Sequence, residues 1–178
     1  MTGRTSAREL AYCGVFGAAA LLLPVLFHLV RLGHVFLPMY LPLVALAFFV
    51  RPLPAAATAL LLPLLSGALT GMPPWFPPTA PCMALELATM SALLALIVTR
   101  FPRVNEWLVL VPVLLLGRVL YVGLAYVAAL WLDLPARFVA GLSLLSGWPG
   151  LVLMVVVVPP VARLRRAARL PAAERSGG

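Results

Sequence analysis

Charged residues are scarce in this chain, and acidic residues are the scarcer kind. Only 10% of the 178 residues are charged and only 5 are Asp or Glu, whereas 63% are hydrophobic. The mean hydropathy is +1.09. A soluble domain of this size could not bury so much apolar side chain. The composition therefore predicts an integral membrane protein.

Cysteines and familiar catalytic motifs are also nearly absent. Cys13 lies early in the first predicted span and Cys82 at the start of the fourth, at opposite membrane faces, which argues against a disulfide. The chain has no P-loop, no G-x-S-x-G elbow and no paired-aspartate span. We therefore expect no catalytic residue, no cofactor and no metal, and this chain is not predicted to be an enzyme.

A formal net charge of +8 might suggest nucleic acid as a partner. The arginines, however, flank apolar segments and form no basic face interleaved with aromatic residues, as nucleic-acid binding would need. We expect the lipid bilayer as a partner and no nucleic acid.

Six apolar segments predict an all-α integral membrane protein with six transmembrane helices in one bundle. The predicted domains are a cytoplasmic N-terminal tail at 1–8, a membrane domain at 9–165 and a basic, disordered cytoplasmic tail at 166–178. The spans are expected at about 9–30, 35–50, 55–70, 80–99, 106–132 and 138–163, the last with a break around 147–150.

Proline and glycine define the expected connections. Arg51–Pro54 predicts a tight turn, and Pro63 predicts a kink in the next helix. Gly71–Pro78 is too rich in proline for a helix, so we expect a rigid aromatic loop there. Asn105 is a candidate N-cap for the helix that starts at Glu106.

The arginines indicate the orientation of the bundle. With six spans and the N-terminus inside, ten arginines fall on the inner side and only two, Arg31 and Arg137, on the outer side. Such a bias places both termini in the cytoplasm. It also places three irregular loops outside, at 34–39, 71–78 and 133–137.

Glu86 and Arg118 lie inside apolar runs, unlike almost every other charge. An ionisable side chain at mid-span costs about 2.5–3.5 kcal/mol on insertion scales, so such residues face protein or water and are candidates for a functional site. A rise of 1.5 Å per residue puts Glu86 about 7–8 Å, and Arg118 about 20 Å, below the outer helix ends. They are either a structural ion pair or the upper and lower polar points of an outward-facing cavity.

Other candidate residues lie near the predicted outer face. His28 and His34 are possible metal ligands, but no H-x-x-x-H or H-E-x-x-H spacing supports that role. Trp75, in the proline-rich loop, is either an interfacial aromatic or a cap that stacks on a ligand. Tyr121 and Tyr126 are candidate pocket walls.

Small residues gather on the first predicted helix. Gly14 and Ala18 have the small-x-x-x-small spacing that lets helices approach closely, and Gly17 lies beside them. This pattern is either ordinary packing or a docking face for a partner membrane subunit.

Four ordered blocks of the sequence resemble a known family. They are GHVFLPMYLP at 33–42, PLLSGALTGMPP at 63–74, ELA at 86–88 and GR at 117–118. Together they resemble the substrate-binding S components of energy-coupling factor (ECF) transporters, in the group that binds vitamins and vitamin precursors. The resemblance covers about residues 10–165. Tyr40 departs from the pattern, because many relatives have histidine after Leu-Pro-Met.

The resemblance implies a six-helix subunit of the bacterial plasma membrane with a substrate pocket near its outer face. It implies docking on a transmembrane coupling subunit that works with two cytoplasmic ATPase subunits, and delivery of the ligand by toppling in the membrane. The expected partner-docking residues are Gly14, Gly17 and Ala18. The expected substrate-binding residues are Glu86, Arg118, Tyr40, Trp75, Tyr121, Tyr126 and His34. The alternative is a structural or assembly scaffold without a small-molecule ligand.

Overall fold

The computed structural model describes residues 6–29, 38–133 and 147–169, and every regular element in them is an α-helix. The helices are α1 (Ala7–Leu29), α3 (Tyr40–Leu46), α4 (Pro52–Thr70), α5 (Thr79–Arg100), α6 (Glu106–Trp131) and α8 (Trp148–Arg169). Four of them, α1, α4, α5 and α6, are long and apolar enough to cross a membrane. The described residues confirm the all-α prediction, and the four apolar helices are consistent with a multi-pass membrane protein.

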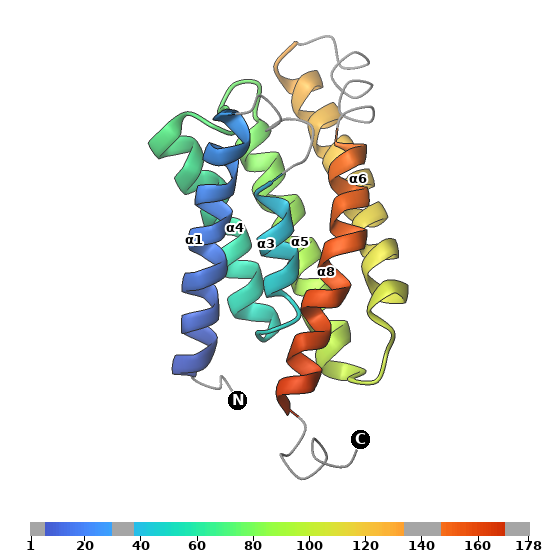
Figure 1. Cartoon of the computed structure of the whole chain (residues 1–178). Helices are drawn as coiled ribbons and strands as arrows, with labels where there is room; N and C mark the ends of the chain where they lie inside the picture. The colour runs from blue at the N-terminus through green and yellow to red at the C-terminus, as the bar shows by residue number, and fades with distance from the viewer. Residues whose placement is uncertain (1–5, 30–37, 134–146, 170–178) are drawn as a thin grey trace, which may run out of the picture.

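The bundle has two distinct ends (Figure 1). One end, here called the basic end, holds the start of α1, the turn before α4, the α5–α6 connection and the end of α8. The opposite end, here called the loop end, carries the α4–α5 connection at 71–78. Of the predicted loops at 34–39 and 133–137, residues 34–37 and 134–137 lie outside the described residues, and residues 38, 39 and 133 form turns.

Helix α3 lies at the centre of the bundle and is only 7 residues long. It packs against α1, α4, α5 and α8, and all its residues except Leu41 are buried. At 1.5 Å per residue it extends about 10 Å, so it cannot cross a bilayer alone. Turns follow it, with Phe48 N and Phe49 N donating to Ala45 O and Leu46 O. Within the predicted span at 35–50, the described residues therefore form only this short helix and the turns next to it.

Several helix boundaries differ from the predictions. Arg51–Pro54 is not a separate turn, because α4 begins at Pro52. Proline fits the first helical turn, where the missing N–H would have no partner in the helix. Helix α8 begins at Trp148 and continues to Arg169, past the expected end of the membrane domain at 165.

Two N-terminal caps explain where long helices begin. Asn105 Oδ1 accepts a hydrogen bond from Trp107 N at 3.0 Å, which confirms the predicted cap of α6. Ser6 and Glu9 form a reciprocal capping box, with each backbone N–H donating to the other side chain at 3.2 Å. Helix α1 therefore starts at Ala7, inside the predicted tail.

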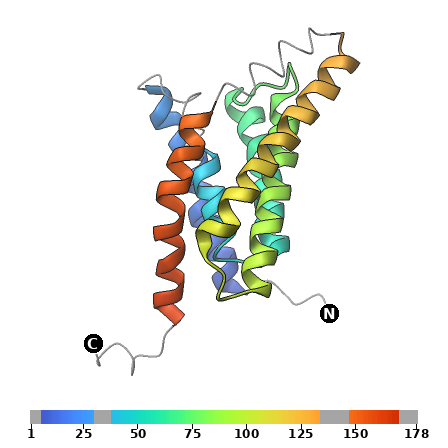
Figure 2. The ribbon, with the colours of Figure 1, turned by 90° about the vertical axis from the view of Figure 1, so that its right-hand side faces the viewer.

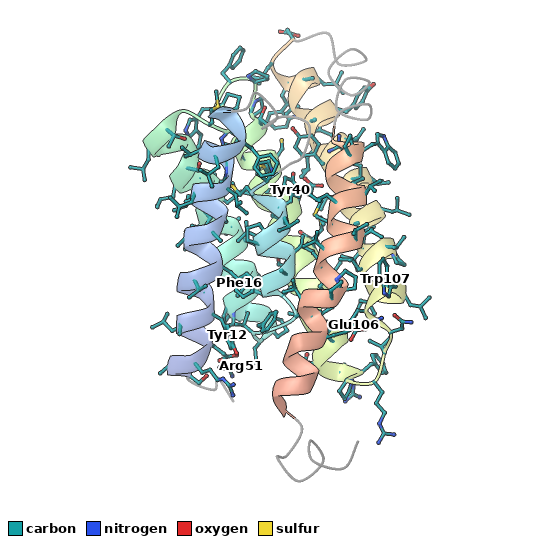
Figure 3. The ribbon with its side chains drawn as sticks, in the orientation of Figure 1. Tyr12, Phe16, Tyr40, Arg51, Glu106 and Trp107 are labelled. Atoms are coloured by element: carbon teal, nitrogen blue, oxygen red, sulfur yellow. The ribbon has the colours of Figure 1, made fainter. Side chains whose placement is uncertain are left out.

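An ion pair joins α1 to the start of α4 at the basic end. Glu9 accepts hydrogen bonds from Arg51 N, Nε and Nη2, each at 3.0 Å. Figure 3 labels Arg51 at this end of the bundle. The hydrogen bonds with Glu9 raise the pKa of the Arg51 guanidinium above its ordinary value. A second pair, Glu106 with Arg163 at 4.0 Å, links the start of α6 to α8.

Candidate functional site

A polar cluster lies around α5, which packs against α3 and against α6. On α5, residues 82, 86 and 90 are buried at a spacing of four, so they share one face of the helix. On α6, residues 114, 118 and 125 are buried and share a face in the same way. These two faces bring Glu86 and Arg118 into the bundle interior, where their side chains are 2% and 6% exposed.

Tyr40, the first residue of α3, binds Glu86 directly. The Tyr40 hydroxyl donates a hydrogen bond to Glu86 Oε2, and both side chains are buried. Among the described residues, Glu86 Oε1 receives no hydrogen bond, so half of the carboxylate remains open to another donor. Figure 3 places Tyr40 in the half of the bundle nearer the loop end.

Arg118 adds a positive charge to the same place. It attracts Glu86 electrostatically and also interacts electrostatically with the Tyr40 hydroxyl. Its guanidinium carbon lies 5.5 Å from the centre of the Tyr121 ring, a cation–π contact within one turn of α6. We call Tyr40, Glu86, Arg118 and Tyr121 the polar cluster.

The depth count from the sequence depends on how α5 and α6 are aligned. That count assumes that the outer ends of α5 and α6 are level, which separates Glu86 from Arg118 by about 12 Å along the bundle. Figure 2 shows instead that α6 is tilted against α5 and continues beyond it at the loop end. Such a tilt changes the separation that the count gives, and Arg118 attracts Glu86 electrostatically.

A close approach of α5 and α6 positions the two charged residues. Gly117 precedes Arg118, and a Cβ at Gly117 would lie only 2.0 Å from Met90 Sδ and 2.6 Å from its Cγ. Met90 is buried and lies one turn after Glu86 on α5. The absence of a side chain at 117 thus lets α6 pack beside the helix turn that carries Glu86.

Other residues around the cluster carry weaker signals in the sequence. The Thr79 side chain, at the start of α5, interacts with the Tyr121 hydroxyl. Cys82, one turn before Glu86, lies close enough to Glu86 to interact electrostatically. Neither residue type stands out in an apolar helix, so sequence reasoning did not include them in the site.

Trp75 packs against α4. A Cβ at Gly67 of α4 would lie 2.8 Å from Pro73 O and 3.2 Å from Trp75 Nε1, so the loop folds onto α4. Ser66 Oγ donates to Met72 O at 2.6 Å and fixes the start of the loop. Trp75 remains 50% exposed, at the end of the bundle where interfacial aromatics are expected.

Two further predicted site residues are not part of the cluster. Tyr126, five residues after Tyr121 on α6, is 41% exposed and faces out of the bundle. His34 lies outside the described residues, as does the side chain of His28. Within the described segments, no group of three His, Cys, Asp or Glu side chains gathers to hold a metal ion.

The small residues of α1 do not form one docking face. Gly17 is buried in the bundle, and a Cβ added at this position would lie 3.4 Å from Leu62 Cδ1 of α4. Gly14 and Ala18 are exposed on α1, and no atom lies within 4 Å of a Cβ at Gly14. Gly17 therefore packs inside the bundle, and docking of a partner at Gly14 and Ala18 stays a prediction.

Comparisons with known proteins add no identification. No protein-family model, no curated protein and no solved structure matches this chain.

Proposed function

We propose that this chain is the substrate-binding subunit of an ECF-type importer, which captures a small water-soluble vitamin or vitamin precursor from outside. The observation that supports this most is the burial of Glu86 and Arg118 inside the bundle, with Tyr40 bonded to Glu86 and Tyr121 beside Arg118. Ionisable residues inside a membrane bundle commonly mark a substrate or ion site. The polar cluster is then the ligand site.

A purely structural pair is a weaker explanation for the cluster. Burying two charges costs desolvation energy, and apolar replacements of buried ion pairs are often neutral or stabilising by about 1–4 kcal/mol. Glu86 also keeps one oxygen without a donor among the described residues. A ligand that donates a hydrogen bond to this oxygen would satisfy it, which explains why the cluster is polar.

The proposed orientation places the loop end outside and the basic end in the cytoplasm of a bacterial cell. Arg8, Arg51, Arg100 and Arg103 all lie at or near the basic end, as the positive-inside rule requires. A ligand then reaches the cluster from the outer half of the bundle. Six membrane spans, with the N- and C-termini inside, complete this arrangement.

The proposed partners are a transmembrane coupling subunit and two cytoplasmic ATPase subunits. Gly14 and Ala18 lie on the exposed face of α1 and permit close approach of another helix. ATP hydrolysis by the ATPase subunits then drives the toppling that delivers the ligand inside.

A structural or assembly scaffold is the second candidate. The hydrogen bond from Tyr40 to Glu86 favours it, because this contact helps to join α3 to α5 and contributes to folding without any ligand. In that role the purified protein binds no small molecule and recruits no ATPase.

Purification from cells that contain a coupling subunit and its ATPases separates the two candidates. The importer proposal predicts that the chain co-purifies with these subunits and that native mass spectrometry detects a retained small molecule. A chain that purifies alone, with no ligand mass, contradicts the importer proposal and supports the scaffold.

A further inference from the structure

Arginines outnumber acidic residues at the basic end of the bundle. Eight arginines of the described segments lie there, with only two acidic residues, Glu9 and Glu106. Each glutamate already faces an arginine, since Glu9 binds Arg51 at 3.0 Å and Glu106 pairs with Arg163 at 4.0 Å. The acidic residues of the described segments can therefore balance only a small part of this positive charge.

The α5–α6 connection presents two of these arginines on either side of an apolar ring. Arg100 ends α5 and Arg103 lies in the connection, and both are exposed. Neither forms an ion pair with another residue of the segments that the structure describes. Phe101, between them, is 59% exposed. At the end of a membrane span such a ring fits the hydrocarbon boundary, while the arginine side chains extend toward the headgroups.

The end of α8 lies beside this connection. Helix α8 packs against α6, and Arg163 pairs with Glu106 where α6 begins, three residues after Arg103. From Arg163 the helix continues to Arg169, with arginines also at 165 and 166. At 3.6 residues per turn, positions 163, 166 and 169 are neighbours along one side of the helix.

Two segments that are far apart in the sequence thus meet at the basic end (Figure 1). We call residues 100–106 and 163–169 together the arginine surface. It carries six arginines and one glutamate. Because like charges repel, such a surface is stabilised by a partner that brings negative charge.

The position of the arginine surface indicates the chemistry of this partner. Helices α5 and α6 are long and apolar enough to cross a membrane, so the connection between them lies near the headgroups of one leaflet. Clusters of roughly four to eight basic residues beside a membrane span attract anionic lipids. The arginine guanidinium also donates two parallel hydrogen bonds to a phosphate. Charge and position together therefore favour a lipid phosphate.

We propose that the arginine surface binds anionic phospholipid headgroups of the leaflet at the basic end. The bound phosphates offset the repulsion between the arginines of the α5–α6 connection and those of α8. This binding goes beyond the importer function, because it involves neither the polar cluster nor a coupling subunit.

Native mass spectrometry of the full chain in detergent tests the proposal. The chain is titrated with phosphatidylglycerol and, separately, with phosphatidylcholine of the same acyl chains. One arginine near the headgroups strengthens binding of an anionic lipid about fivefold, so several should give a preference of at least about tenfold for phosphatidylglycerol. Added salt should reduce this preference. Equal binding of the two lipids contradicts the proposal and favours an acidic protein as the partner of this surface.

A soluble competitor distinguishes a lipid from a free phosphate compound. Glycerol phosphate has the charged group of the lipid without its acyl chains, so it should not displace phosphatidylglycerol at equal concentration. Displacement at equal concentration contradicts a lipid site.

Single charge removals assign the preference to the arginine surface. Arg103→Gln in the connection and Arg166→Gln in α8 should each lower the preference for phosphatidylglycerol about fivefold. Arg8→Gln is the matched control, because Arg8 is also exposed at the basic end but lies on α1, away from the connection (Figure 1). An equal loss in Arg8→Gln contradicts the assignment to this surface.

A charge-conserving variant separates charge from folding. Arg103→Lys keeps the positive charge and should retain most of the preference. If Arg103→Lys loses as much of the preference as Arg103→Gln, the loss reflects a change of structure, and this result contradicts the proposal.

Discussion

The Tyr40 hydroxyl donates a hydrogen bond to Glu86 Oε2, and this contact joins the first residue of the short central helix α3 to the buried face of α5. Arg118 and Tyr121 of α6 interact electrostatically with the Tyr40 hydroxyl, and they contact each other. The hydrogen bond joins α3 to α5, and the electrostatic attraction between Glu86 and Arg118 links α5 to α6.

Removal of the Tyr40 hydroxyl should destabilise the protein. Tyr40→Phe leaves Glu86 without its hydrogen-bond donor among the described residues, and an unsatisfied buried group costs about 1–3 kcal/mol. Thermal unfolding in detergent measures the loss. Tyr126→Phe is the matched control, because that side chain is exposed, and it should change the stability little. Equal effects of the two substitutions would contradict the assignment.

A methyl group at position 117 should disturb the contact of α5 with α6. Gly117→Ala places a Cβ 2.0 Å from Met90 Sδ, and such overpacking typically costs about 1–3 kcal/mol. Gly123→Ala on the same helix meets no atom within 4 Å and should be neutral or slightly stabilising. The melting temperatures of the two variants provide the comparison, and a neutral Gly117→Ala would rule out the close approach.

The loop at 71–78 should move when Gly67 gains a side chain. Gly67→Ala brings a Cβ to 2.8 Å from Pro73 O, a backbone atom that cannot yield without a shift of the loop. Tryptophan fluorescence reports the change through Trp75, whose ring lies against Gly67. Gly14→Ala, in open space on α1, should leave the spectrum unchanged, and identical spectra for both variants would contradict the packing of the loop on α4.

Loss of the Glu9 carboxylate should loosen the basic end. Glu9 accepts a hydrogen bond from the Arg51 backbone N–H as well as from its guanidinium, so Glu9→Ala frees that amide. Hydrogen–deuterium exchange should then accelerate at Arg51 and in the first turn of α1, which also loses its capping box. Arg100→Ala at the same end is the control, and protection at Arg51 that survives Glu9→Ala would show that the ion pair is not formed.

Most helices could be predicted from the sequence, because apolar runs and their breakers are local signals. The bounds of α5 and α6 agree with the prediction to within one residue at each end. Local composition does not fix tilt, which depends on packing against neighbouring helices. The count of residues from helix ends takes no account of the tilt of α6 against α5, so the separation of Glu86 and Arg118 along the bundle stays a prediction.

The places of the candidate aromatic residues could not all be predicted from the sequence, for a related reason. Tyr40 and Tyr121 join Glu86 and Arg118 in the cluster, but Trp75 packs on α4 and Tyr126 faces outward. An aromatic residue near the end of a span fits a pocket wall and a membrane interface equally well. Only the rotation of each helix about its axis distinguishes these roles, and neighbouring helices set that rotation.

The central claim is that the polar cluster holds a small molecule, and retention of a ligand by Arg118→Ala tests it most directly. The wild-type chain and this variant are purified in the same way, and native mass spectrometry compares their bound small molecules. Arg118→Ala/Glu86→Gln is included because it leaves no unpaired charge in the bundle. The account predicts that both variants insert into the membrane and lose the ligand, while Val119→Ala retains it. A ligand bound with unchanged affinity in Arg118→Ala would contradict the account.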